Sequence, residues 1–189
     1  MTHRSTAELE AFLPTILDSP DDLGTLELIV RRPIVGARET LTQGELDLAA
    51  GLVGDSWALR GSSRTADGAA HPDMQLNVMN SRLVGFLAGD PQRRALAGDQ
   101  LYLDLDLSID NLPPGSRLVF GEDGGIRPEI EVTEQPHTGC AKFVERFGAE
   151  AMAFVNGRTG RPLRLRGLNA KVAVPGTIRV GDRVRVTRP

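Results

Sequence analysis

The second half of the chain contains many short segments in which apolar and polar residues alternate, and this pattern constrains the fold most. In residues 101–107 (LYLDLDL), leucines at the odd positions alternate with Tyr or Asp, so the two sets would lie on opposite faces of one strand. Further strands are predicted at residues 118–120, 129–132, 163–174 and 177–187, with Gly- and Pro-rich turns nearby. Many short strands joined by tight turns favour a mainly β fold, a closed or nearly closed β-barrel with helical insertions.

Other segments carry helix signals. Helices are predicted over residues 5–18, 42–52, 76–87 (after a short extended start) and 141–154. The first two begin with capping boxes, Ser5 with Glu8 and Thr42 with Glu45. A chain of 189 residues is long enough for one domain. We expect residues 1–24 to form a helical extension to a single barrel domain over residues 25–189, which begins with a strand at residues 25–31.

Charge is distributed unevenly along the chain. The net charge is −3, yet the segment from Arg158 to Pro189 holds nine basic residues against one acid, Asp182. This segment is either a set of solvated, Arg-rich strand faces or a site for an anionic ligand. Nucleic acid is not expected as a partner, because the chain is acidic overall and lacks interleaved aromatic residues. The sequence also lacks an apolar run long enough to span a membrane and the pattern of a secretory signal, so no membrane partner is expected.

The single cysteine, Cys140, excludes an internal disulfide and any zinc site with several thiolates. A reducing, cytoplasmic compartment is therefore expected. Pro136 and Gly139 predict a turn that places Cys140 at the start of a helix, where backbone N–H groups stabilise negative charge. His137 and Lys142 add donor or positive character, and these conditions favour a reactive thiolate. The alternative is a small, buried, inert side chain.

The order of several motifs resembles that of the MOSC domain, the module named for the C-terminal domain of molybdenum cofactor sulfurases. The matching segments are GLVGD (51–55), GDQL (98–101), LPPGSRLVFG (112–121), IEVT (130–133), GCAK (139–142), RGLNAKV (166–172) and PGTIRVGD (175–182). Together they extend from about Thr25 to Val186. The resemblance implies a β-barrel and one reactive cysteine, which maps onto Cys140.

The resemblance also implies a role with the pyranopterin molybdenum cofactor. Cys140 would carry sulfur as a persulfide or bind the molybdenum, and a sulfurtransferase or a reductase of N-hydroxylated compounds would be its partner. In the sulfurases a separate domain uses pyridoxal phosphate, so none is expected on this chain. Two departures are evident. Some stand-alone members carry His-His-Gly-Gly where this chain has residues 56–60, and many have Pro where this chain has Gly139.

Candidate residues for the cofactor follow from charge and position. Arg164 and Arg166, two residues apart on a predicted strand, would share one face and hold a phosphate with paired N–H groups. Arg60 is a second candidate, with a plain surface arginine as its alternative. Asp55 would either accept from pterin nitrogens or cap a turn. His137, Gly139 and Lys142 would surround Cys140. The competing hypothesis is a non-catalytic binding module in which Cys140 is inert.

Overall fold

The computed structural model describes residues 3–122 and 124–189. Within this range seven strands close into a barrel, in the order β1-β6-β5-β9-β8-β7-β11. They are β1 (Leu23–Arg31), β5 (Leu76–Asn80), β6 (Leu101–Asp104), β7 (Arg117–Phe120), β8 (Glu129–Val132), β9 (Leu168–Val174) and β11 (Arg183–Thr187). The pair β5–β6 is parallel and the other barrel pairs are antiparallel. The predicted mainly β fold with a closed barrel is confirmed.

The barrel closes where β1 pairs with β11, with Gly24 opposite Val184. On its other side β1 pairs with β6, and the register shifts between Leu26 and Leu28. A Cβ atom at Gly24 would overlap the carbonyl oxygen of Asp104 and press on Leu105. A residue without a side chain therefore allows β1 to approach β6 at the closure.

Two hydrophobic clusters lie on the two faces of the barrel wall. The odd-numbered leucines of residues 101–107 fill the barrel interior with residues such as Phe120 and Ile130. Tyr102 points the other way, as the alternation predicts, but it is fully buried under the helices with Val30 and Met79. At Tyr102 the second face of the strand is therefore buried under the helices, whereas at Asp104 and Asp106 it is partly exposed.

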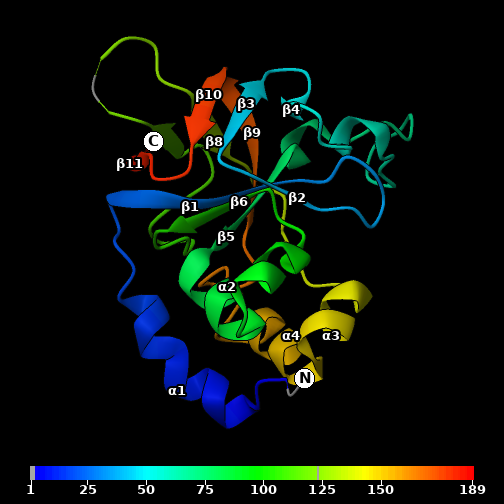
Figure 1. Cartoon of the computed structure of the whole chain (residues 1–189), viewed down its shortest axis with the longest axis vertical. Helices are drawn as coiled ribbons and strands as arrows, with labels where there is room; N and C mark the ends of the chain where they lie inside the picture. Colours follow the sequence, from blue (N-terminus) through cyan, green and yellow to red (C-terminus); the bar gives the residue numbers. More distant parts are fainter. Residues whose placement is uncertain (1–2, 123) are drawn as a thin grey trace.

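The helices form a layer below the barrel (Figure 1). They are α1 (Thr6–Leu17), α2 (Ser81–Ala88), α3 (Ala141–Phe147), α4 (Ala149–Asn156) and the 3-10 helix η3 (Pro91–Ala97). The Ser5–Glu8 capping box of α1 is present, and Leu9 of that helix is fully buried in the helical cluster. The helix predicted at residues 141–154 is divided into two by Gly148, whose φ is +95°.

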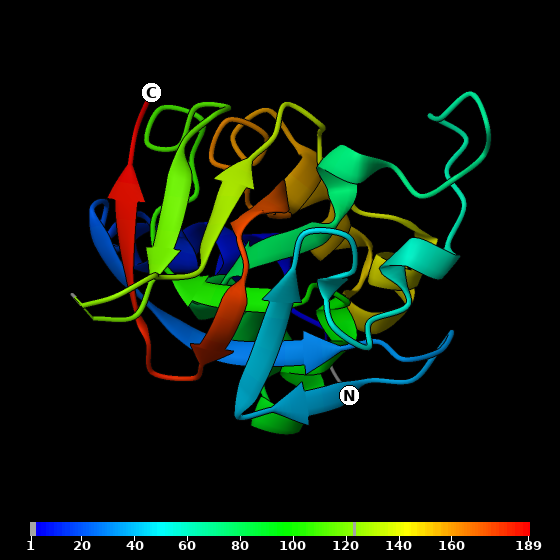
Figure 2. The ribbon, with the colours of Figure 1, turned by 90° about the horizontal axis from the view of Figure 1, so that it is seen from above.

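The helix predicted over residues 42–52 is wrong. This segment forms β3 (Gln43–Asp47) and β4 (Gly51–Leu52), which join β10 (Gly176–Arg179) in a small sheet. Figure 2 shows β3 and β10 side by side at the end of the barrel away from the helices. Glu45, expected to cap a helix, accepts a hydrogen bond from Thr177 on β10. Pairing with a strand far along the chain overrides the local signal. A short strand β2 (Glu39–Leu41) pairs with β1 in antiparallel orientation.

The strand predicted at residues 163–174 begins only at Leu168. Residues 158–166 form turns instead, and Arg164 has a φ of +45°. Leu163 and Leu165 still pack into the hydrophobic cluster beneath the barrel. Arg164 and Arg166 therefore do not share a strand face, and the prediction that they do is wrong.

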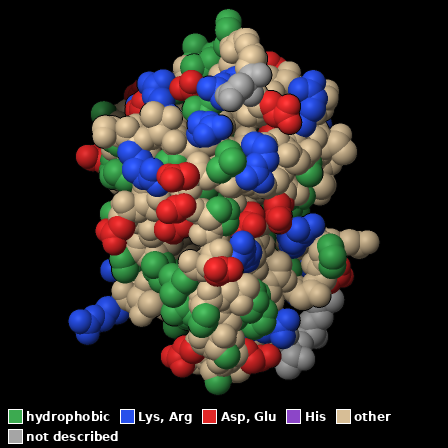
Figure 3. All heavy atoms as spheres, turned by 90° about the vertical axis from the view of Figure 1, so that its left-hand side faces the viewer, with side chains coloured by type: hydrophobic (Ala, Val, Ile, Leu, Met, Phe, Trp, Pro, Cys, Tyr) green, Lys and Arg blue, Asp and Glu red, His purple; other side chains and the backbone are tan. Residues whose placement is uncertain are grey.

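Three of the nine basic residues of the C-terminal segment pair with acids from earlier parts of the chain. Arg166 binds Asp99, Arg188 binds Asp22, and Lys171 lies between two carboxylates. Basic and acidic side chains are also interspersed on the face in Figure 3. Among the described residues, tertiary ion pairs thus offset three of the nine basic residues of this segment. No helix among the described residues has the length and apolar character needed to cross a membrane.

Candidate functional site

Cys140 lies at the N-cap of α3, at the end of the loop that leaves β8. Its carbonyl oxygen accepts from the N–H groups of Phe143 (2.8 Å) and Val144 (3.2 Å), and its side chain makes no capping hydrogen bond. The thiol is free and the residue is exposed. The predicted helix start is confirmed, and the alternative of a small buried side chain is wrong.

The loop before Cys140 is anchored through His137. The Nε2 atom of His137 lies 2.8 Å from Oδ1 of Asp99, a fully buried carboxylate. Asp99 also accepts hydrogen bonds from Nη1 of Arg166, at 2.9 and 2.8 Å. The Arg166 guanidinium lies 4.9 Å from the centroid of the Phe143 ring on α3. Asp99 thus connects the loop before Cys140, through His137, to the helix after it, through Arg166.

The charge states of this anchor follow from burial and proximity. Burial opposes ionisation of Asp99, but Arg166 and His137 hold the pKa of its carboxyl below the ordinary value. Burial and then Arg166 lower the pKa of His137, so its ring is neutral near pH 7. Because an ionised carboxylate only accepts hydrogen bonds, His137 donates through Nε2. This tautomer leaves a lone pair on Nδ1.

Gly139 allows the loop to lie against α4. Its N–H donates to Oδ1 of Asn156 at 3.1 Å. A Cβ atom at this position would collide with Sδ of Met152. With Gly139 before Cys140 in place of Pro, the loop packs closely against the side chains of Met152 and Asn156.

A second buried ion pair, between Arg32 and Asp55, lies next to the segment that carries Asp99. Arg32 donates to both oxygens of Asp55 at 2.8 Å, through Nε and Nη2. The Arg32 Nη1 atom reaches the carbonyl of Gly98 (2.9 Å) and Oδ1 of Asn77 (3.1 Å). Asp55 also accepts from the N–H of Trp57, at the start of the 3-10 helix η1 (Trp57–Leu59). In this structure Asp55 holds Arg32 and caps a turn, the second of its two predicted roles.

Further arginines converge near Gly98 without a carboxylate partner. A Cβ atom on Gly98 would lie 3.4 Å from Nη2 of Arg38 and 3.9 Å from Nη1 of Arg146. Arg60 lines a cavity with Arg32 and has Ser56 Oγ as its hydrogen-bond partner. We call Arg32, Arg38, Arg60 and Arg146 the arginine cluster. Among the described residues, only Arg32 of this cluster forms an ion pair.

The arginine cluster is electrostatically unbalanced. Burial, then Arg146 and Arg32, lower the pKa of the Arg38 guanidinium, and burial followed by Arg32 lowers that of Arg60. The Nε atom of Arg38 is buried and has no hydrogen-bond partner among the described residues. Guanidinium groups that repel one another and keep unused donors are suited to bind an anion.

The predicted site residues therefore fall into three groups. His137, Gly139 and Cys140 lie together in the loop, with Lys142 exposed in the first turn of α3. Arg60 belongs to the arginine cluster and Asp55 lies beneath it. Arg166 belongs to the Asp99 anchor. Both Arg164 and Arg166 line a separate cavity of about 410 Å³ that also includes His137.

Sequence reasoning missed Arg32, Arg38 and Asp99 as site residues. Their positions gave two weak signals: Arg32 precedes Pro33 at the end of a predicted strand, and Asp99 belongs to the GDQL motif. Both views place α3, the loop at residues 32–38 and the segment at residues 53–71 on the same side of the molecule (Figures 1 and 2). Only the folded barrel brings these segments together.

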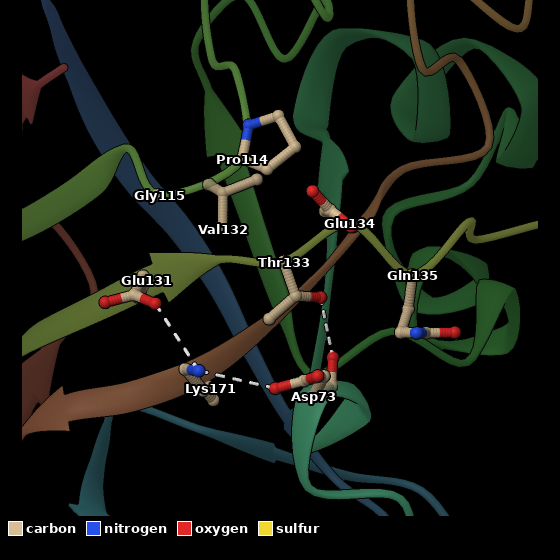
Figure 4. A pocket seen from close by; sticks show the side chains of 9 residues that line it. All are labelled: Asp73, Pro114, Gly115, Glu131, Val132, Thr133, Glu134, Gln135 and Lys171. Carbon is tan, nitrogen blue, oxygen red and sulfur yellow. Dashed lines mark hydrogen bonds and ion pairs between the residues drawn. The ribbon is translucent and has the colours of Figure 1, made fainter. Parts of the chain in front are cut away.

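A further hollow of about 320 Å³ is lined by one base, Lys171, and three acids, Asp73, Glu131 and Glu134 (Figure 4). Nζ of Lys171 lies 3.3 Å from Asp73 and 3.4 Å from Glu131. Thr133 Oγ1 donates to the carbonyl of Asp73 at 2.7 Å. The one base of this hollow is matched by carboxylates, so the hollow offers an anion less positive charge than the arginine cluster does. Among the described residues, no group of three or more His, Cys, Asp or Glu is placed to hold a metal ion.

Comparison with known proteins identifies the fold. YuaD from Bacillus subtilis superposes with a TM-score of 0.58 at 16% identity, over 87% of this chain and 95% of its own. YiiM from Escherichia coli gives a TM-score of 0.52 at 20% identity, over 86% of this chain and 69% of its own. YiiM from Geobacillus stearothermophilus gives 0.54 at 16% identity, over 87% and 75%. The fold is MOSC-like.

YuaD and YiiM are MOSC-domain proteins, and this chain shares their closed barrel with helical insertions. No protein-family model and no curated protein sequence matches the chain significantly. At these identities the likeness concerns the fold. The chemistry of the site must be argued from its own residues.

Proposed function

We propose that this protein binds the pyranopterin molybdenum cofactor and uses the Cys140 thiol as a sulfur carrier or as a ligand to molybdenum. The observation that carries the proposal is an exposed, unpaired thiol on the same side of a MOSC-like barrel as an arginine cluster with unused donors. A thiolate is a soft ligand suited to either task. The cofactor's phosphate is the anion that the cluster would receive.

The residues of this chain fit such a group. Arg38 and Arg60 would bind the phosphate, because they have donors to spare and no carboxylate to satisfy them. Arg166 is buried and engaged with Asp99, so it would position the Cys140 loop and not hold the phosphate itself. When bound, the cofactor would supply molybdenum-centred redox chemistry that no side chain provides.

As a sulfur carrier, Cys140 would react without any added oxidant. Its thiolate would attack the outer sulfur of a donor persulfide, the donor's S–S bond would break, and the donor would leave as a thiolate. The outer sulfur then stays on Cys140 as a persulfide. The expected partners are a cytoplasmic sulfurtransferase, or a reductase that uses the cofactor. Lys142, two residues after Cys140, is exposed in the first turn of α3.

Cys140 is expected to accept one sulfur atom from a cysteine desulfurase supplied with cysteine. Intact-mass spectrometry should show a gain of one sulfur that a reductant removes, and Cys140→Ser should show none. Arg185→Gln, an exposed change on β11, is the matched control and should gain sulfur like the wild type. If the thiol is alkylated readily but never gains sulfur, the carrier role is wrong, and only the metal-ligand role stands.

A further inference from the structure

A cavity of about 410 Å³ lies between the Cys140 loop, α4 and the turns before β9. Its volume falls within the usual range for sites that bind small molecules. His137 and Thr138 line it, and they precede Cys140 by three and two residues. The cavity is distinct from the one lined by Arg32 and Arg60.

Arg164 gives this cavity a positive charge without a counter-ion. Its Nη1 donates to the carbonyl of Leu112 at 2.6 Å, and it forms no ion pair within the described part of the chain. Burial lowers the pKa of its guanidinium, with no carboxylate to oppose the effect. Its φ of +45° is the one positive value for a non-glycine residue in the described ranges. Strained backbone and an uncompensated, half-buried cation are both characteristic of binding sites.

The charges around the cavity select the ligand. Arg161 and Glu134 are exposed at its edge and carry opposite charges. The charge of Arg166 is matched by Asp99, and His137 is neutral. One positive charge, that of Arg164, is left over, so the cavity suits a monoanion. Apolar side chains complete the lining: Ile109, Pro136, Val155 and Leu168.

We propose that this cavity binds a small organic carboxylate with an apolar body. Arg164 holds the carboxylate, and the body lies against Ile109, Val155 and Leu168. Resting on the proposed function, this ligand is the substrate class of the Cys140 site, whose loop lines the cavity through His137 and Thr138. A phosphate dianion is excluded from this role because the cavity carries too little net charge, whereas the arginine cluster carries more.

Benzoate is a suitable probe, with benzylamine as its cationic counterpart. We expect benzoate to titrate the amide signals of Thr138 and Leu168 saturably in ¹⁵N NMR spectra, and benzylamine not to do so. Arg164→Gln should weaken benzoate binding at least about tenfold, as expected when a charge-assisted hydrogen bond is lost. Arg185→Met, an exposed change on β11, should leave it unchanged.

A second pair of variants covers the case in which Arg164→Gln does not fold. Ile109 is 45% exposed, so Ile109→Asp and Ile109→Asn should both fold. We expect Ile109→Asp to bind benzoate several-fold more weakly than Ile109→Asn, because its carboxylate repels the probe. Equal binding by both, equal binding of benzylamine, or shifts confined to the arginine cluster would overturn the proposal. Cys140→Ser should bind benzoate normally, so failure of the Cys140 chemistry would leave this result intact.

Discussion

Replacing Asp99 by alanine is expected to lower the free energy of unfolding by about 3–5 kcal/mol, because it leaves the buried Arg166 guanidinium without its counter-charge. Chemical denaturation followed by circular dichroism measures this change. The matched control is Glu39→Ala, which breaks the half-exposed pair with Arg31 and should cost less than about 1 kcal/mol. If both variants lose the same amount, Asp99 is not the anchor we describe.

The same anchor makes stability depend on pH. The folded-state pKa values of Asp99 and His137 both lie below their ordinary values of 3.8 and 6.5. The folded protein therefore binds fewer protons than the unfolded chain as the solution becomes acidic. Stability from His137 is fully present above about pH 6.5 and is lost as pH falls through its folded pKa, and that from Asp99 is lost at still lower pH. His137→Asn should flatten the first part of this loss.

Replacing both Arg38 and Arg60 by methionine is expected to abolish measurable phosphate binding. Each lost charge-assisted hydrogen bond is worth about 1.5–3 kcal/mol, so each substitution weakens binding roughly 10- to 100-fold. Titration of inorganic phosphate at low salt, followed by ¹⁵N NMR, measures the effect. Because Arg38 has a buried, unpaired Nε, its replacement should not reduce stability, which separates a binding role from a structural one.

Arg185→Met on the final strand is the control for bulk charge. It should weaken phosphate binding slightly, and moderate salt should remove the difference. If Arg185→Met and the double variant lose affinity equally, and salt erases both losses, the arginine cluster is only part of a diffuse positive field.

Local signals predicted the fold where neighbours along the chain decide the structure. The Ser5–Glu8 capping box and the alternation over residues 101–107 are both present as expected. Thr42 with Glu45 gave the same helix signal as Ser5 with Glu8, yet that segment is a strand. The difference arises because Glu45 is paired with Thr177 on β10, and no local pattern records a partner that distant.

The candidate site also has features that adjacent residues predict and features that depend on distant residues. The helix start at Cys140 and its closeness to His137 follow from a few adjacent residues and could be predicted. The anchor could not, because Asp99 is separated from His137 by 38 residues and from Arg166 by 67. The two-residue spacing of Arg164 and Arg166 predicted that both side chains lie on one face of a strand. The segment between Gly160 and Gly167 forms turns instead, so Arg166 binds Asp99 and Arg164 does not. Closure of the barrel, not spacing, decides which charges meet.

The proposal depends most directly on whether Cys140 holds the cofactor. Wild type and Cys140→Ser should be incubated with cofactor released from a purified molybdoenzyme, then separated from free ligand and assayed for molybdenum and pterin fluorescence. The serine keeps the shape of the site but removes the soft ligand. We expect the wild type to retain molybdenum and pterin together and Cys140→Ser to lose molybdenum. Equal retention of both by the two proteins would show that Cys140 is not part of the site.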